Sequence, residues 1–253
     1  MDGTWLLLAA TALFAGFVDA VAGGGGMVQV PALLSAFPAE APATLFGTNK
    51  GASIFGTANA ALRYARRIAV PWSLAVPAAG TAFLSSWLGA AAVAWLPREV
   101  LRPLILVLLV AVTAYTALRK DMGMGAAAAP PRPGMAIPAA VAGAVLGFYD
   151  GFFGPGTGSF LIFVFVRFFA LDFLRASAVA KVVNVATNAA ALLYFAPTGH
   201  VLWGLALTMA VFNVAGATVG SRLAISRGSG FVRGVFLLVS AVLIAKFGYD
   251  TFH

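Results

Sequence analysis

The sequence predicts an all-α integral membrane protein built from two inverted-topology repeats, each a re-entrant helical hairpin with a glycine-rich tip plus three transmembrane helices. Three observations support this prediction: the composition, an internal repeat, and the distribution of basic residues. Of 253 residues, 61% are hydrophobic and only 9% are charged, whereas soluble domains carry about 25% charged residues. A soluble core of this size could not bury so much apolar surface, so the bilayer is the expected solvent.

The charged and sulfur-containing residues exclude several other classes of protein. The chain carries 16 basic and 8 acidic residues, a net charge of +8. A basic chain can bind nucleic acid, but these basic residues sit in short segments between apolar runs, which favours a membrane protein. The absence of cysteine excludes disulfides and thiolate metal sites. The N-terminal stretch lacks the basic region and cleavage site of a signal peptide, so we expect it to be retained as the first membrane element.

The chain repeats itself without a gap at the offset of 131 residues that separates Lys50 from Lys181. Matched alanines and leucines are uninformative in such a chain, but rarer residues recur at the same offset. They include Asp19 with Asp150, Trp72 with Trp203 and Arg102 with Arg233. This recurrence indicates a duplicated unit. We therefore divide the chain into a first transmembrane repeat (1–118), a cytoplasmic linker (119–134) and a second transmembrane repeat (135–253).

Each repeat begins with two apolar runs that are too short to cross a bilayer. They cover 5–18 and 27–37 in the first repeat, and 135–148 and 159–171 in the second. A crossing needs about 20 helical residues, and these runs have roughly 11 to 14. We interpret each pair as a re-entrant hairpin whose tip lies inside the membrane, against protein or a wet cavity. The longer segments, expected to cross, are 44–64, 72–96, 100–118, 175–195, 201–221 and 231–249.

Basic residues test this topology. With a cytoplasmic linker, the inner loops hold 11 lysines and arginines and the outer segments hold 3, which is a positive-inside bias. The inner residues are Arg63, Arg66, Arg67, Arg119, Lys120, Arg132, Arg167, Arg175, Arg222, Arg227 and Arg233, and the outer ones are Arg98, Arg102 and Lys246. This distribution places the two repeats in opposite orientations and both chain termini outside.

One pair of motifs carries a family resemblance. The first repeat reads GFVDAVAGGGGMVQVPALL at 16–34, followed by LFGTNK at 45–50. The second reads GFYDGFFGPGTGSFL at 147–161, followed by AVAKVVN at 178–184. With this spacing, nearly the whole chain resembles the sulfite exporter TauE/SafE family of permeases. The resemblance implies a polytopic permease for sulfite, organosulfonates, other sulfur oxyanions or small carboxylates.

The two glycine-rich tips are candidate binding sites for an oxyanion. Each tip precedes a short helix, so it presents backbone N–H groups at the positive end of a helix dipole. Close helix packing is the alternative role, because glycine is common in membrane helices. The tip candidates are Gly23, Gly24, Gly25, Gly26, Gly154, Gly156, Thr157 and Gly158. We expect the anion to bind near the midplane, between the two tips.

Two lysines and two aspartates inside the membrane are the charged candidates. A lysine within a membrane helix has a free-energy cost, which makes a functional role a reasonable hypothesis. We expect Lys50 and Lys181 to bind the anion, to pair with an aspartate, or to extend toward the interface. Asp19 and Asp150 directly precede the tips, and they are candidates for helix capping, for pairing with a lysine, or for proton coupling.

Amide and hydroxyl side chains accompany both lysines. Helical spacing places Asn184 and Asn188 on the same face as Lys181. Interhelical hydrogen bonding and the lining of a cavity are both open roles for this polar set. The set comprises Thr48, Asn49, Ser53, Thr57, Asn59, Asn184, Thr187, Asn188 and Asn213, with Gln29 as a weaker candidate. The second motif has lost the GTN that precedes Lys50, so the two halves of the site need not be equivalent.

These features favour a secondary transporter for a small anion, driven by a gradient. The sequence shows no nucleophile triad, metal-ligand spacing, pair of catalytic acids or ATP-binding motif, so we expect no catalytic or metal residues and no cofactor. The alternatives are a membrane-embedded enzyme or accessory subunit, and a passive anion channel. The expected partners are the small anionic substrate and the lipid bilayer, without nucleic acid, and a homodimer is left open. We expect a multi-pass location in the bacterial cytoplasmic (inner) membrane.

Overall fold

The computed structural model describes residues 3–95 and 134–252, with backbone alone at 236, 237 and 239–252. Within these ranges the fold is all-helical, as predicted. The helices are α1 (Gly3–Ala22), α2 (Gly25–Ala36), α3 (Pro42–Arg67), α4 (Trp72–Trp95), α6 (Ala136–Phe152), α7 (Thr157–Phe169), α8 (Phe173–Phe195) and α9 (Trp203–Phe252). The segment expected at 100–118, nearly all of the linker 119–134 and the side chain of Lys246 lie outside the described residues.

Several of these helices have the length and composition of membrane spans. α1, α4, α8 and the stretch of α9 from Trp203 to Val235 each contain an apolar window long enough to cross a bilayer. α3 has 26 residues, about 39 Å at 1.5 Å per residue, but polar residues near its centre lower its hydropathy. Large apolar side chains such as those of Leu84 and Val211 are more than half exposed on the outer surface. The chain is a multi-pass membrane protein, in which lipid covers such a surface.

α1 and α6 are longer than the apolar runs from which they were predicted. The runs end at Val18 and Phe148, whereas α1 continues to Ala22 and α6 to Phe152. The aspartates that follow these runs, Asp19 and Asp150, lie inside the helices and do not end them. Each helix ends instead just before a glycine of positive φ, +78° at Gly23 and +93° at Gly154. Glycine adopts that conformation without the steric cost that a side chain imposes.

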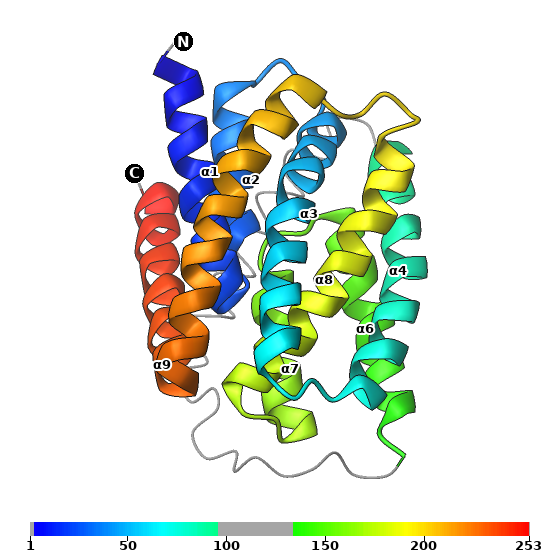
Figure 1. Cartoon of the computed structure of the whole chain (residues 1–253). Coiled ribbons are helices and arrows are strands. Elements are labelled where there is room, and N and C mark those ends of the chain that lie inside the picture. Colours follow the sequence, from blue (N-terminus) through cyan, green and yellow to red (C-terminus); the bar gives the residue numbers. More distant parts are fainter. Residues whose placement is uncertain (1–2, 96–133, 253) are drawn as a thin grey trace.

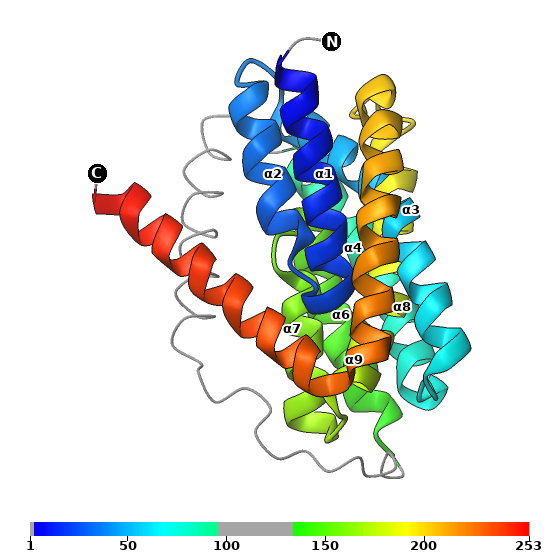
Figure 2. The same ribbon diagram turned by 60° about the vertical axis from the view of Figure 1, so that its left-hand side comes forward.

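α9 bends sharply at Gly228, where φ is +75° and ψ is −172°. These values are not helical, so the chain from Trp203 forms two helical stretches that meet at an angle (Figure 2). The sequence predicted two separate segments here, at 201–221 and 231–249. The bend lies between them, at a glycine that can adopt the required backbone angles.

Helices of the first half pack extensively on helices of the second. α1 packs against α9, α4 packs against α6, and α3 lies beside α8 and α9 (Figure 1). Glycines allow close approach at two of these contacts. A Cβ at Gly89 of α4 would overlap the Phe148 carbonyl, and a Cβ at Gly220 of α9 would overlap the Phe17 carbonyl. Small residues at helix crossings let membrane helices pack backbone to backbone.

The two short hairpins enter the bundle from opposite ends. In Figure 1, α1 descends from the upper end to the middle and α2 returns upward, whereas α6 rises from the lower end to the middle and α7 returns downward. The glycine-rich turns of both hairpins therefore lie at the centre of the molecule. The long helices α3, α4, α8 and the first stretch of α9 run between the two ends.

Arginines gather at one end of the bundle. The eight arginines in the described ranges lie on the last turns of α3, at the end of α7 and the start of α8, and around the bend of α9, which share the lower end in Figure 1. At the opposite end, the connections 37–41 and 196–202 contain no lysine or arginine. The basic loops predicted at 63–71, 167–175 and 222–233 are thus together in space.

Candidate functional site

Lys50 and Asp150 form a buried ion pair that joins the two halves of the chain. The Lys50 Nζ of α3 lies 2.7 Å from the Asp150 Oδ2 of α6. The two side chains are only 4% and 6% exposed. Removing one partner of a buried pair typically costs about 3–5 kcal/mol, because the other charge remains buried without compensation.

Lys181 and Asp19 form a second ion pair between the halves. The Lys181 Nζ of α8 lies 3.1 Å from the Asp19 Oδ2 of α1, and the two side chains are 0% and 18% exposed. The Thr57 hydroxyl of α3 donates a hydrogen bond to the same carboxylate oxygen at 3.3 Å. Asp19 therefore has two donors, whereas among the described residues Lys50 is the single side chain that donates to Asp150.

The two ion pairs are equivalent under the sequence repeat. The offset that relates Lys50 to Lys181 also relates Asp19 to Asp150, and each lysine bonds to the aspartate of the other half. Pairing with an aspartate was one of three roles predicted for these lysines, and it is the arrangement that the structure shows. While both pairs are intact, their charges cancel.

The two glycine-rich tips are in direct contact. The Ser159 N–H donates to the Gly23 carbonyl at 3.2 Å, and the Ser159 hydroxyl donates to the Ala22 carbonyl at 2.8 Å. A Cβ added to Gly23 or to Gly158 would overlap backbone atoms of the other tip. The tips leave no room for an anion at this contact, so the space available to a ligand lies beside it.

Each tip begins a helix. Gly24 is the N-cap residue of α2, and Gly156, with φ of +86°, is the N-cap residue of α7. The first turn of a helix has N–H groups without intrahelical acceptors. Among the described residues, no acceptor bonds the N–H groups of Gly25, Gly26 and Gly158. These donors, together with the positive ends of two helix dipoles, favour negative charge nearby.

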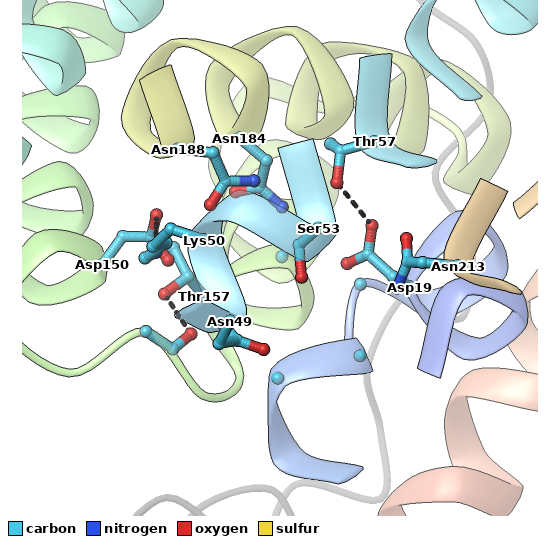
Figure 3. Close-up of a pocket in the computed structure, with 15 residues that line it drawn as sticks. Asp19, Asn49, Lys50, Ser53, Thr57, Asp150, Thr157, Asn184, Asn188 and Asn213 are labelled. Atoms are coloured by element: carbon cyan, nitrogen blue, oxygen red, sulfur yellow. Dashed lines mark hydrogen bonds and ion pairs between the residues drawn. The ribbon is translucent and has the colours of Figure 1, made fainter. Parts of the chain in front are cut away.

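A small cavity opens beside the tips, between the two ion pairs. Figure 3 shows Lys50 and Asp150 on one side, Asp19 and Asn213 on the other, and Asn184 and Asn188 between them. About 30 Å³ of it is open to water-sized groups, which is more than the roughly 10–15 Å³ that one water needs. The complete lining is Asp19, Gly23, Gly25, Gly26, Asn49, Lys50, Ser53, Thr57, Asp150, Gly154, Thr157, Gly158, Asn184, Asn188 and Asn213.

Two lining amides have unused hydrogen-bonding capacity. The Oδ1 atoms of Asn49 and Asn184 are buried and have no partner among the described residues. Both residues are only 6% exposed. Buried polar atoms are usually hydrogen-bonded, so orphaned ones need an explanation such as a missing ligand. A half-turn of either amide group would present N–H donors to the same space.

Seven of the candidate residues lie outside the cavity lining: Gly24, Thr48, Gly156, Lys181, Asn59, Thr187 and Gln29. The Thr48 hydroxyl donates to the Thr44 carbonyl at 2.7 Å and accepts the Leu202 N–H at 3.0 Å, just before α9 begins. Lys181 is fully buried behind Asp19. Gly24 and Gly156 are the N-cap residues described above, so their roles are conformational. The remaining predicted tip glycines, Thr157, Asn49, Lys50, the two α8 asparagines and both aspartates all line the cavity.

Ser159 and Tyr149 had not been predicted to support the site, whereas Gln29 was the weaker candidate of the polar set. Ser159 joins the tips through two hydrogen bonds, yet its counterpart at the repeat offset is Val28, so the repeat gave no signal for it. Tyr149 supports the second tip, because its hydroxyl donates to the Pro155 carbonyl at 2.6 Å. Gln29 accepts a hydrogen bond from Asn213 at 3.3 Å, and its own Nε2 lacks a partner in the described chain.

Comparisons with known proteins agree with this architecture. A family model described as sulfite exporter TauE/SafE matches residues 8–247. The chain belongs to the TauE/SafE family. This match covers both ion pairs and both tips, so the whole site lies within the family's common region. The TauE/SafE motifs quoted from the sequence thus resembled the correct family.

Relatives of this TauE/SafE chain are described as membrane transporters. The probable membrane transporter protein YfcA of Escherichia coli (strain K12) is 36% identical over 241 residues, which cover 95% of this chain and 88% of the relative. The probable membrane transporter protein ORF9 of a Sinorhizobium species is 36% identical over 242 residues, 96% of this chain and 91% of the relative. A probable membrane transporter protein of Haemophilus influenzae is 31% identical over 240 residues, 93% and 91% of the two chains. No solved structure matches the chain.

Proposed function

We propose that this protein is a secondary permease that carries a small anion across the bacterial cytoplasmic membrane, driven by a gradient. The proposed substrates are sulfite, an organosulfonate, another sulfur oxyanion or a small carboxylate, and the description of the family as a sulfite exporter supports the first of these. The multi-pass fold and the bacterial sources of the relatives support the proposed location.

One observation carries the proposal: the N-termini of two short helices meet Lys50 and a row of asparagines at a single cavity. Backbone N–H groups at helix N-termini bind oxyanions without adding a full charge. Asn184 and Asn188 supply side-chain donors, and Lys50 supplies a positive charge. A moderately charged site of this kind releases its ligand more readily than a cluster of free lysines, as a transport cycle requires.

We further propose that the two halves are inverted-topology repeats and that α1–α2 and α6–α7 are re-entrant hairpins. The opposite directions of the hairpins in Figure 1 support this arrangement. The contacts between the halves also support it, because α1 of the first half packs on α9 of the second, and the equivalent helices α6 and α4 pack on each other. Broken helices that meet near the midplane are typical of secondary transporters, whose repeats move relative to each other around a central site.

Flux into liposomes is the direct test. Purified protein is reconstituted, and uptake of radiolabelled sulfite and of a labelled sulfonate and carboxylate is measured with and without a pH gradient. Saturable uptake that concentrates one of these anions is the expected result. Flux that only dissipates an existing gradient would indicate a channel, and the absence of protein-dependent flux for all three anions would refute the proposal.

A further inference from the structure

We propose that the anion binds to Lys50 in place of Asp150, and that Asp150 takes up one proton in the same step, while the Lys181–Asp19 pair stays intact. The inference rests on the proposed function, and it assigns different roles to two ion pairs that the sequence repeat makes equivalent. Lys50 becomes the ligand-binding lysine and Lys181 a positioning residue.

The two ion pairs differ in their access to the cavity, and this difference favours the assignment. Both members of the Lys50–Asp150 pair line the cavity, and Gly154 of the second tip lies against them. Lys181 is fully buried and does not line the cavity. An anion in the cavity can therefore reach the Lys50 ammonium, whereas the Lys181 ammonium does not border the cavity.

The number of hydrogen-bond donors at each aspartate also favours Asp150 as the group that takes up the proton. Asp19 receives hydrogen bonds from Lys181 and Thr57. Asp150 receives one from Lys50 among the described side chains. An anion that takes over the lysine consequently leaves Asp150 without a donor, while Asp19 keeps both of its donors.

Charge balance then requires the proton. With both pairs intact, the four charged groups at the site sum to zero. An anion that bonds to Lys50 leaves the Asp150 carboxylate buried and uncompensated, which is strongly unfavourable in such surroundings. A proton that moves from water to this carboxylate removes its charge, so anion and proton enter together and the site remains neutral. This coupling is electroneutral for a monovalent anion.

Among the residues that the structure describes, no other titratable group is placed to take over this proton. The described part of α4 has no charged residue, and α7 has Arg167 near its far end. From α8, the side chains at the cavity are those of Asn184 and Asn188. Lys50 of α3 is the cation bonded to Asp150, and Tyr149 of α6 donates its hydroxyl to the Pro155 carbonyl. Asp19 and Lys181 lie across the cavity and are bonded to each other.

Calorimetric titration of the purified full-length protein measures the proton directly. Binding enthalpy is recorded in buffers of different ionisation enthalpy, and the slope gives the protons taken up per anion bound. The probes are sulfite, methanesulfonate and acetate. With whichever probe binds, we expect wild type to take up one proton more than Asp150→Asn. In the pH range where Asp150 is ionised in the free protein, the affinity of wild type for a strong-acid anion such as methanesulfonate should fall about tenfold for each unit of pH increase. Asp150→Asn should bind without this pH dependence.

Three further variants complete the test. Asp172→Asn removes a carboxylate that caps α8 away from the cavity, keeps a good capping residue, and should behave as wild type. The charge-neutral double variant Asp19→Asn/Lys181→Gln should still take up one proton per anion. Lys50→Gln/Asp150→Asn should fold, because no charge is left unpaired, but should lose at least tenfold in affinity.

The outcomes separate the two proposals. Binding of an anion by wild type with the same proton count as Asp150→Asn overturns the inference and leaves the permease intact. Loss of the proton in the Asp19→Asn/Lys181→Gln variant assigns the coupling to the other pair and also overturns it. Absence of binding and flux with all three probes refutes the proposed function, and the inference with it.

Discussion

The Ser159 N–H donates to the Gly23 carbonyl at 3.2 Å, and this hydrogen bond joins the N-terminal part of α7 to the turn that follows α1. The Ser159 hydroxyl adds a second hydrogen bond, to the carbonyl of Ala22, the last residue of α1. The contact connects segments that are 136 residues apart and belong to different halves. A single residue therefore holds together the two tips beside which the cavity lies.

Ser159→Ala should destabilise the protein modestly. The substitution removes the hydroxyl bond to Ala22 but leaves the backbone bond to Gly23, so we expect a loss of about 1 kcal/mol. This corresponds to a fall in Tm of roughly 2–4 °C, measured by thermal unfolding in detergent. Ser226→Ala is the matched control, because the exposed Ser226 hydroxyl bonds only within its own helix, and it should leave the Tm unchanged. Equal shifts for the two variants would contradict the proposed role of the tip contact.

Gly158→Ala should prevent normal folding or assembly of the tips. A Cβ at this position would lie 2.5 Å from the Gly23 carbonyl oxygen and 2.6 Å from its Cα, which are backbone atoms that cannot rotate away. We expect little monodisperse protein in size-exclusion chromatography. Gly80→Ala is the control, since a Cβ there meets nothing within 4 Å and alanine favours the helix. A well-folded Gly158→Ala variant would show that the tips are not in contact in the membrane.

Lys181→Met should destabilise the protein more than it changes the affinity for the anion. Methionine fills much of the same volume, but Asp19 then keeps only its Thr57 donor in a largely buried position. We expect a loss of about 3 kcal/mol or somewhat less, because Asp19 is partly exposed. Chemical unfolding with increasing denaturant measures this loss. Restoration of stability by the added substitution Asp19→Asn would confirm that the cost comes from the unpaired carboxylate.

The arginine-rich end of the bundle should face the cytoplasm. Lysines and arginines are retained on the inner side of membrane proteins, and the described arginines gather at the end that carries the α3–α4 connection and the bend of α9. On this cysteine-free background, Ser226→Cys should be protected from an impermeant maleimide in intact cells, and Pro197→Cys, in the connection at the opposite end, should be labelled. The reverse labelling pattern would invert the topology.

Much of the fold could be predicted from the sequence because hydrophobicity and duplication are local or one-dimensional signals. Composition alone indicates the membrane, and the repeat offset makes Lys50 equivalent to Lys181 and Asp19 equivalent to Asp150. Glycine-rich segments marked both tips, because positive φ at Gly23 and Gly154 favours that residue. The sequence misplaces the end of a helix where a charged residue follows an apolar run, as at Asp19, because α1 continues to Ala22.

Only the tertiary structure decided which charges meet. The sequence left three roles open for each lysine, since it could not show that Lys50 reaches the aspartate of the other half rather than its own. That pairing depends on how α3 and α6, 100 residues apart at the bonded positions, pack across the bundle. The tertiary structure also shows that Lys181 is fully buried and bonded to Asp19, whereas Lys50 lines the cavity. Sequence symmetry determines equivalent positions, but solvent access and hydrogen-bond partners arise from packing, where substitutions such as Ser159 opposite Val28 make the two halves different.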